Sequence, residues 1–293
     1  MKFPIVTRRQ LQKVESRLSE ATKRIEKLRQ QNVDLKNQRD EARLAARAGF
    51  ADIGSKSRHP RKLLATALEG EGIEIGALHF PLPVPDRVRV KYVDLATREE
   101  NIQRHPNLDP EAIVETDYVC DGETLEIVPD ESQDFVIANH MLEHCINPLR
   151  TLNNFLRVLK PGGLIFLALP DKRFTFDVER PITPFDHIEE DFRIDRTEED
   201  LSVYEDWTTH VGKNSDPVRF HKEQKNIHFH VWTQSEILEM FIEARRRLEM
   251  PFEIEWAAKN GGEFIVLVRK YGQLEEAIEK EISEKSFNDL KRP

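Results

Sequence analysis

Apolar residues near the start of the chain recur at alternating steps of three and four. These positions, with one Asn among them, are Leu11, Val14, Leu18, Ala21, Ile25, Leu28, Asn32 and Leu35. Neither Gly nor Pro occurs between Gln10 and Ala48. The steps are those of the a and d positions of a coiled coil, and Asn32 falls at an a position, where a buried amide often fixes a parallel pair. The pattern predicts a coiled-coil helical arm over residues 1–48, with the repeat over 8–47, that forms a homodimer.

The charges of this arm leave two other interpretations open. Across the predicted seam Arg24 faces Arg29 and Gln31 faces Lys36, so these pairs repel or are neutral. The seam could instead pack on an acidic surface, including this protein's own body, or the segment could be a single amphipathic surface helix. Residues 49–70 are predicted to be a linker and a short helix that leads into the next domain.

Short apolar runs alternate with helical patterns from residue 71 to 272. The predicted strands are 72–77, 88–95, 116–122, 134–141 and 164–171, followed by the pair 252–258 and 263–270 around Asn-Gly-Gly. The predicted helices are 148–159 and 233–248, the second with a capping box of Thr233 and Glu236. Such alternation is typical of parallel βαβ units. We predict an α/β fold with a doubly wound seven-stranded sheet, made of five parallel strands and a closing antiparallel hairpin. The segment 172–232 is an irregular insertion, and 273–293 is a C-terminal helix or tail.

The charge is distributed unevenly along the chain. The first 70 residues hold 17 of the 44 Lys and Arg but 8 of the 53 Asp and Glu, so the remainder is strongly acidic. An acidic body repels a nucleic-acid backbone, and we therefore expect no nucleic-acid substrate. No apolar run has the length of a signal peptide or a bilayer span, which predicts a cytoplasmic protein without integral membrane contact. Cys120 and Cys145 suit small buried residues better than a disulfide framework.

Polar residues and glycines end each of the predicted parallel strands. They are Glu74 and Gly76, then Asp94, then Asp121 and Gly122, then Asn139 and His140, and last Asp171. In an open α/β sheet, ligands bind outside the carboxyl ends of the strands, where the strand order reverses. Asp94 stands 20 positions after Glu74. In nucleotide-binding α/β folds an acidic residue at about this distance binds the ribose, because its carboxylate can accept both hydroxyls. These residues are therefore predicted to converge on one cofactor site.

The stretch DGETLEIVPDESQDFVIANHMLEHCINPLRTLNNFLRVLKPGGLIFLALPD resembles class I methyltransferases that depend on S-adenosyl-L-methionine (SAM). In that family an Asp precedes "LP…DxSFD", "VLEH" follows the fourth strand, and "LRPGG" precedes the fifth. The resemblance covers about residues 72–171 and the closing hairpin. The further strings GALHFPLP, PDKRFTFD and RPITPFDH resemble a bacterial subgroup linked to polysaccharide biosynthesis.

The resemblance implies a role for each strand-end residue. Glu74 and Gly76 would lie against the methionine part of SAM, and Asp94 would hold the ribose. Asp121, followed by Gly122, would bind the adenine amino group. Asn139 and His140 would form the floor of the pocket beneath the sulfonium.

One element departs from the family pattern. The family's glycine loop reads E-x-G-x-G, whereas Leu78 stands here at the second glycine, followed by His79 and by prolines 81, 83 and 85. Three prolines prevent the usual helix from following the loop. We expect the loop to take another course, with His79 near the carboxylate of SAM. The alternative is a non-catalytic methyltransferase-like scaffold module in a glycan-assembly complex. An NAD-dependent dehydrogenase would need G-x-G-x-x-G, which is absent.

The insertion 172–232 is expected to cover the side from which a methyl acceptor approaches. It is rich in histidine and aromatic residues, and transfer to a hydroxyl needs alignment and a base. The candidate bases are Asp186 with His187, which ranks first, and then His228 and His230. His228-x-His230 would also suit a metal site if both lay on one strand, but no residue is assigned as a metal ligand. The resulting hypothesis is a SAM-dependent enzyme that O-methylates a small-molecule or glycan acceptor.

Overall fold

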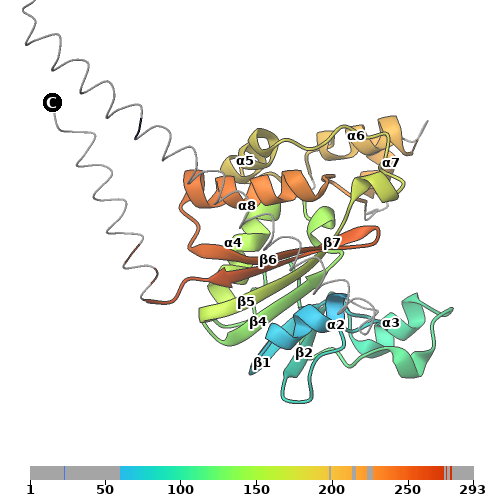
Figure 1. Cartoon of the computed structure of the whole chain (residues 1–293). Helices are drawn as coiled ribbons and strands as arrows, with labels where there is room; N and C mark the ends of the chain where they lie inside the picture. Colours follow the sequence, from blue (N-terminus) through green and yellow to red (C-terminus); the bar gives the residue numbers. More distant parts are fainter. Residues whose placement is uncertain are drawn as a thin grey trace, which may run out of the picture. The chain divides into compact units, whose positions relative to one another are not determined.

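The computed structural model describes residues 60–197, 199–212, 216–222 and 227–273, together with Lys23, Glu275 and Ile278. Figure 1 shows the described body as a sheet with helices on its faces. The predicted coiled coil over 1–48, the predicted linker over residues 49–59 and most of the tail over 273–293 lie outside the described residues. These predictions therefore stay untested.

A seven-stranded sheet forms the centre of this body. Its strands are β1 (Glu71–Ile75), β2 (Arg89–Asp94), β3 (Tyr118–Val119), β4 (Gln133–Asn139), β5 (Leu159–Pro170), β6 (Phe252–Asn260) and β7 (Glu263–Lys270). The strand order is β3-β2-β1-β4-β5-β7-β6. Strands β1 to β5 pair in parallel, while β7 is antiparallel to both β5 and β6. The prediction of five parallel strands closed by a hairpin is confirmed.

Helices cover one face of the sheet and bury its larger core. They are α4 (Pro148–Val158), α5 (Phe185–Arg193) and α8 (Gln234–Leu248), which lie above the strands in Figure 1. Strand β4 and the second half of β5 are almost entirely buried, because both faces of the sheet are covered there. This burial explains why their sequences are continuous apolar runs. Helix α8 begins with the predicted capping box of Thr233 and Glu236.

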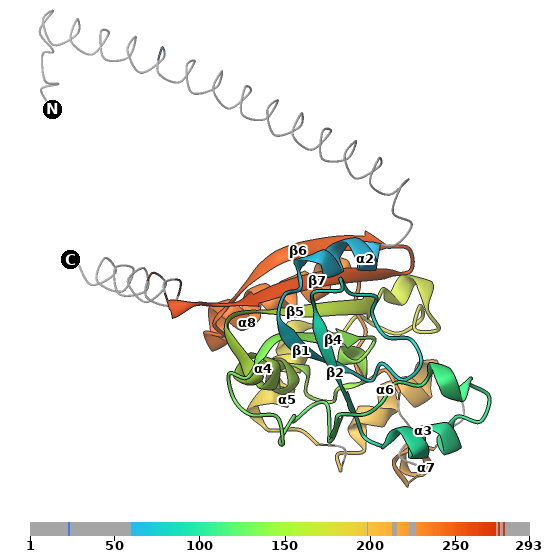
Figure 2. The same cartoon turned by 90° about the horizontal axis from the view of Figure 1, so that it is seen from below.

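The opposite face is covered by shorter segments. Helix α2 (Pro60–Leu64) and the 3-10 turn η1 (Ala65–Ala67) cross it, as Figure 2 shows from below. Leu64 and Leu68 pack there with Leu82 and Val88 against Phe135 of β4. Residues 77–88 contain no helix, as the prolines predict. This extended loop therefore supplies apolar cover that a helix after β1 would otherwise provide.

Several helices were not predicted from the sequence. Helix α3 (Arg98–Arg104) starts at a capping box of Thr97 and Glu100. The insertion is more regular than expected, because it contains α5, α6 (Ser202–His210) and α7 (Pro217–Lys222). No helix among the described residues is long and apolar enough to cross a membrane.

Candidate active site

The strand register brings the predicted residues to one edge of the sheet. Ile75 of β1 pairs with Val93 of β2 and with Ala138 of β4. The residues that follow these three are Gly76, Asp94 and Asn139, which therefore reach the carboxyl edge at the same level. Parallel pairing thus assembles side chains that are far apart in the sequence.

Gly76 opens space above the end of β1. Its φ of +66° lies in the left-handed region that glycine adopts without steric cost. Its N–H donates to the carbonyl oxygen of Val93 over 2.9 Å, and a Cβ built on it would meet no atom within 4 Å. A ligand can therefore approach the backbone closely at this position.

The loop after Gly76 keeps a glycine-like path at the position of the missing second glycine. Leu78 has a φ of 49°, which is uncommon for a residue with a side chain. Its carbonyl oxygen accepts the N–H of Val114 over 2.8 Å, a contact that fixes the turn. Leu78 therefore adopts the left-handed backbone conformation without being a glycine.

Glu74 holds the far end of the same loop. Its buried carboxylate accepts the N–H of Leu82 at 2.9 and 3.1 Å, and Asn139 Nδ2 donates to it over 3.3 Å. Burial raises the pKa of Glu74 to about 7, although these hydrogen bonds act in the opposite direction. Glu74 is thus an anchor of the proline-rich loop as well as a wall of the cavity described next.

Two cavities meet at the end of β1 and β4. The first, of about 550 Å³, and the second, of about 630 Å³, share Ile75, Gly76, Asn139 and His140. Both volumes fall in the range of small-molecule sites. Because the cavities share these residues, they form two arms of one cleft.

The predicted cofactor residues all line this cleft. Glu74 and His79 line the first arm only, whereas Asp94, Asp121 and Gly122 line the second arm only. Gly76, Asn139 and His140 line both arms. The structure therefore brings the eight residues together, while their contacts with SAM stay predictions.

Local backbone contacts fix the two acidic residues of the second arm. Asp94 accepts the N–H of Ala96 over 3.2 Å, and Asp121 accepts the N–H of Glu123 over 2.8 Å. In each case one carboxylate oxygen bonds to the turn that follows the strand. Such turns limit the rotation of the side chain and pre-organise it for a ligand.

His140 lies between two carboxylates at the junction of the arms. Its Nε2 is 2.6 Å from Glu263 Oε2, and its Nδ1 is 3.4 Å from Glu143 Oε1. Glu143 and Glu263 together raise the pKa of His140 to about 9. Arg61 Nε also donates to Glu263 over 2.7 Å, which ties α2 to the hairpin. His140 is therefore a fixed cation in the wall of the cleft.

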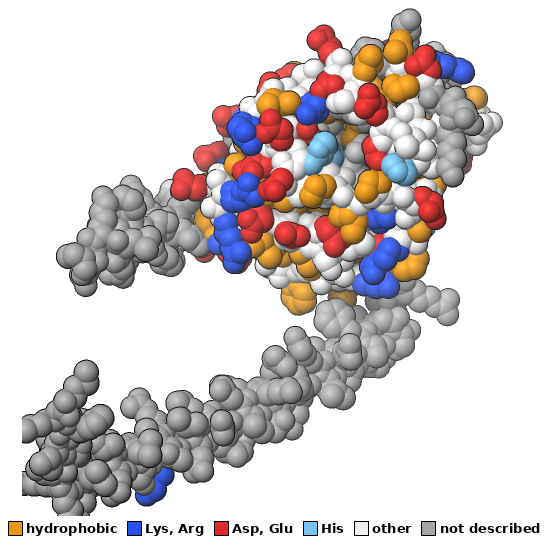
Figure 3. All heavy atoms as spheres, turned by 90° about the horizontal axis from the view of Figure 1, so that it is seen from above, with side chains coloured by type: hydrophobic (Ala, Val, Ile, Leu, Met, Phe, Trp, Pro, Cys, Tyr) orange, Lys and Arg blue, Asp and Glu red, His pale blue; other side chains and the backbone are white. Residues whose placement is uncertain are grey.

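The first-ranked catalytic candidates lie elsewhere. Asp186 and His187 belong to α5, which packs on α4 and α8, and neither residue lines the two arms. Asp186 pairs with Arg247 over 2.8 Å. Acidic and basic side chains lie close to one another on the face of the body that Figure 3 shows. The side chain of His187 is 53% exposed and its Nε2 is 3.3 Å from Asp191. Their catalytic role stays a prediction that this position does not favour.

His228 and His230 do not share a strand, so the expected common direction is wrong. The segment that carries them has no regular secondary structure. His228 Nδ1 lies 2.6 Å from Asp177 Oδ2, whereas His230 Nε2 lies 3.0 Å from the carbonyl oxygen of Ile146. Burial lowers the pKa of His230 to about 4, so this side chain is neutral at pH 7.

Sequence reasoning missed three residues of the second arm. His144, Tyr204 and Phe229 line it together with the predicted cofactor residues. His144 belongs to the "LEH" string directly after the fourth strand. The position of this string at a strand end could have indicated that His144 lines the cleft. Tyr204 and Phe229 come from the insertion, and their rings lie 5.5 Å apart. The insertion therefore does reach the cleft, as expected, but through other residues.

Comparison with known proteins gives this cleft a context. Residues 72–167 match the family model described as a methyltransferase domain, and no curated protein matches the chain. A SAM-dependent methyltransferase structure from Aquifex aeolicus is 15% identical, with a TM-score of 0.40 over 71% of this chain and 86% of that one. A SAM-dependent methyltransferase structure from Methanosarcina mazei is 17% identical, with a TM-score of 0.38 over 70% and 94%.

The matched segment runs from β1 into β5 and contains the carboxyl ends of the four strands that build the cleft. The chain therefore carries a methyltransferase domain and is an enzyme. Its cofactor is S-adenosyl-L-methionine, and a methyl acceptor is its second substrate.

Proposed function

We propose that this enzyme transfers the methyl group of SAM to a hydroxyl group of a small-molecule or glycan acceptor. The observation that carries the proposal is the convergence of Asp94, Asp121, Gly76 and Asn139, from four parallel strands, on one cleft. The adenosine half of SAM occupies the second arm, with its ribose on Asp94 and its adenine near Asp121. The methionine half extends past Gly76 toward His79.

The acceptor approaches over the part of the second arm that the insertion covers. Tyr204 and Phe229 line this part, and aromatic faces suit a sugar ring or another flat apolar group. Methyl transfer is an in-line displacement, so the acceptor oxygen lies opposite the sulfur of SAM. A link to polysaccharide biosynthesis is supported by the resemblance of the strings GALHFPLP, PDKRFTFD and RPITPFDH.

Calorimetric titration with SAM and S-adenosylhomocysteine tests the cofactor half of the proposal. Asp94→Ala removes both ribose acceptors, which costs about 1.5–3 kcal/mol for hydrogen bonds to a charged group. The dissociation constant should therefore rise roughly 10- to 150-fold. Asp86→Ala is the matched control, because Asp86 is exposed and lines neither arm. Equal affinity in the two variants would show that the ribose assignment is wrong.

Transfer of a labelled methyl group to a panel of sugars and their deoxy analogues tests the acceptor half. The expected product is a methyl ether, which is identified by its carbon chemical shift. Methylation at nitrogen or carbon would overturn the hydroxyl assignment. Tight SAM binding without any transfer would instead favour the scaffold alternative.

A further inference from the structure

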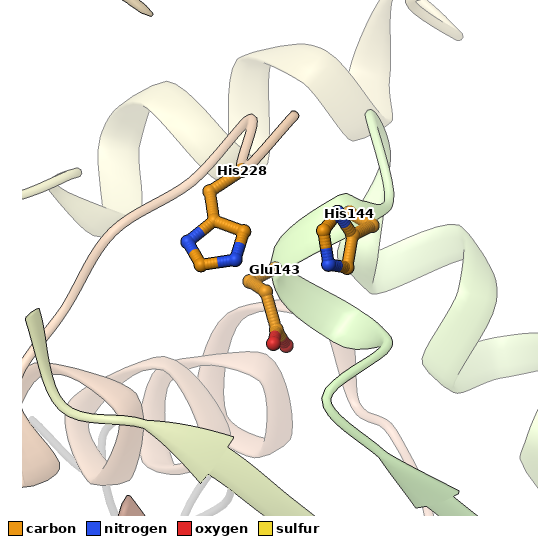
Figure 4. Close-up of side chains that lie close together, drawn as sticks. All are labelled: Glu143, His144 and His228. Atoms are coloured by element: carbon orange, nitrogen blue, oxygen red, sulfur yellow. The ribbon is translucent and has the colours of Figure 1, made fainter. Parts of the chain in front are cut away.

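Three side chains with metal-binding atoms meet beside the second arm of the cleft. Glu143 and His144 belong to the 3-10 turn η3 (Leu142–His144) after β4, and His228 comes from the insertion. One ligand atom from each lies within 4.8 Å of those of the other two. Figure 4 shows the rings of His228 and His144 on either side of the Glu143 side chain, with its carboxylate below both rings in this view.

Glu143 is a buried carboxylate that no described residue hydrogen-bonds. The residue is 1% exposed, and neither of its oxygen atoms accepts a hydrogen bond from the part of the chain that the structure describes. The imidazole of His140 is 3.4 Å from Oε1, outside hydrogen-bonding geometry. Burying an ionised group is costly unless it is paired and hydrogen-bonded, and the nearby cation His140 leaves both oxygens without a hydrogen bond, so the carboxylate can accept a second cation.

Backbone and side-chain oxygens orient the two histidines of the cluster. His228 Nδ1 is 2.6 Å from Asp177 Oδ2, and His144 Nδ1 is 2.9 Å from the carbonyl oxygen of Ile227. Arg180 holds the same Asp177 from its other oxygen over 2.8 Å. A neutral imidazole that donates from Nδ1 carries its lone pair on Nε2, which is the usual arrangement around metal-bound histidines.

We propose that Glu143, His144 and His228 bind one divalent metal ion of the zinc or manganese kind. Two imidazoles and one carboxylate are ligands that such ions prefer. Ligand atoms on one ion at about 2.1 Å are at most about 4.2 Å apart, so small side-chain rotations close the cluster. His144 also lines the second arm, which puts the ion next to the part of the cleft proposed for the acceptor.

The role of the ion rests on the proposed function. An acceptor hydroxyl bound to the ion becomes more acidic and loses its proton to water. Its oxygen then forms a bond to the methyl carbon while the bond from this carbon to sulfur breaks. Sulfur keeps the electron pair, which leaves S-adenosylhomocysteine as a neutral thioether. The ion thus supplies the activation that a general base would otherwise provide.

A second cluster in the insertion serves as the matched control. His187, Asp191 and His230 also lie within reach of one another. There, however, Arg196 already forms an ion pair with the carboxylate of Asp191. A guanidinium that donates a hydrogen bond to the carboxylate opposes a metal ion more strongly than His140 does beside Glu143, where no such hydrogen bond forms, so this cluster is the weaker site.

The test measures metal bound to the full chain after dialysis against a chelator. Zn²⁺, Mn²⁺ or Mg²⁺ is added alone, and the bound metal is quantified by mass spectrometry after desalting. We expect one equivalent of Zn²⁺ or Mn²⁺ in the wild type. Glu143→Gln and His228→Ala should each weaken binding at least about tenfold, because each removes one of three ligands. His187→Ala should bind metal as the wild type does.

Three outcomes would overturn the metal site. These are no binding of any of the three ions, binding that survives both substitutions, and binding that is lost in His187→Ala. Thermal unfolding of each variant controls for folding, and a chelator should lower the melting temperature of the wild type but not that of Glu143→Gln. SAM titration is run in parallel: SAM binding without metal refutes only the metal site, and metal binding without SAM refutes only the proposed function.

Discussion

Replacement of Glu74 by Gln removes the ionisation of a buried carboxylate and keeps its size. Glu74 is 1% exposed, and its oxygens accept the N–H of Leu82, which holds the loop after β1. Burial raises the pKa of Glu74 from 4.5 to about 7 in the folded state. The unfolded chain therefore loses this proton at lower pH than the folded chain does.

The sign and size of the effect follow from this difference in pKa. A raised folded pKa contributes stability that is fully present below pH 4.5 and is lost as the pH rises through about 7. Each pKa unit corresponds to about 1.4 kcal/mol. Between pH 5 and pH 8 the wild type should lose about 2–3 kcal/mol of unfolding free energy through Glu74, and Glu74→Gln should lose none of it.

Urea denaturation of both proteins at pH 5, 6, 7 and 8 measures the effect. The stability of Glu74→Gln relative to the wild type should improve steadily up to about pH 7 and then level off. Glu69→Gln is the control for the loss of one carboxylate, because Glu69 is exposed nearby. If the wild type and Glu74→Gln have parallel profiles, Glu74 is ionised throughout and the reasoning from burial is wrong.

Four further changes have defined expectations. Leu78→Gly should raise the unfolding free energy by roughly 0.5–1 kcal/mol in urea titrations, or leave it unchanged, because glycine adopts the left-handed conformation without strain. Glu263→Gln should lower the pKa of His140 from about 9, measured by NMR titration of its ring, since one of two carboxylates is neutralised. If His187 is the general base, His187→Ala should reduce turnover by roughly 10²–10⁴-fold; its position outside the cleft instead predicts turnover within a few-fold of the wild type, which assays under saturating SAM measure. Deletion of residues 1–48 should leave a SAM-binding body. If the arm forms the dimer, light scattering should give two chains per particle for the full chain and one for the shortened chain.

The sheet could be predicted because buried parallel strands leave continuous apolar runs. Strand β5 begins at Leu159, earlier than the predicted 164, since Pro161 and the two glycines after it are also typical of a helix end. Helix α3 has the same capping-box signature as α8 but buries only Asn101. Without an apolar stripe, a short helix gives no periodic signal.

The cofactor side of the site was more predictable than the acceptor side for a topological reason. Parallel register alone brings Gly76, Asp94 and Asn139 to one edge, so the spacing along the chain carries the information. The histidines of the insertion depend on a tertiary path that has no such repeat. His228 and His230 are two residues apart, yet one contacts Asp177 and the other contacts the carbonyl of Ile146.

The proline-rich loop explains how the cleft keeps its shape without the second glycine. A helix after β1 would cover the sheet and present its N-terminus to the methionine end of SAM. Here Leu82 and Val88 provide the cover, and the carboxylate of Glu74 is occupied in holding Leu82. A carboxylate offers about four acceptor sites, so contact with the amino group of SAM would have to be shared with these hydrogen bonds. We predict that the backbone of residues 76–80 and His79, which line the first arm, also hold the methionine end.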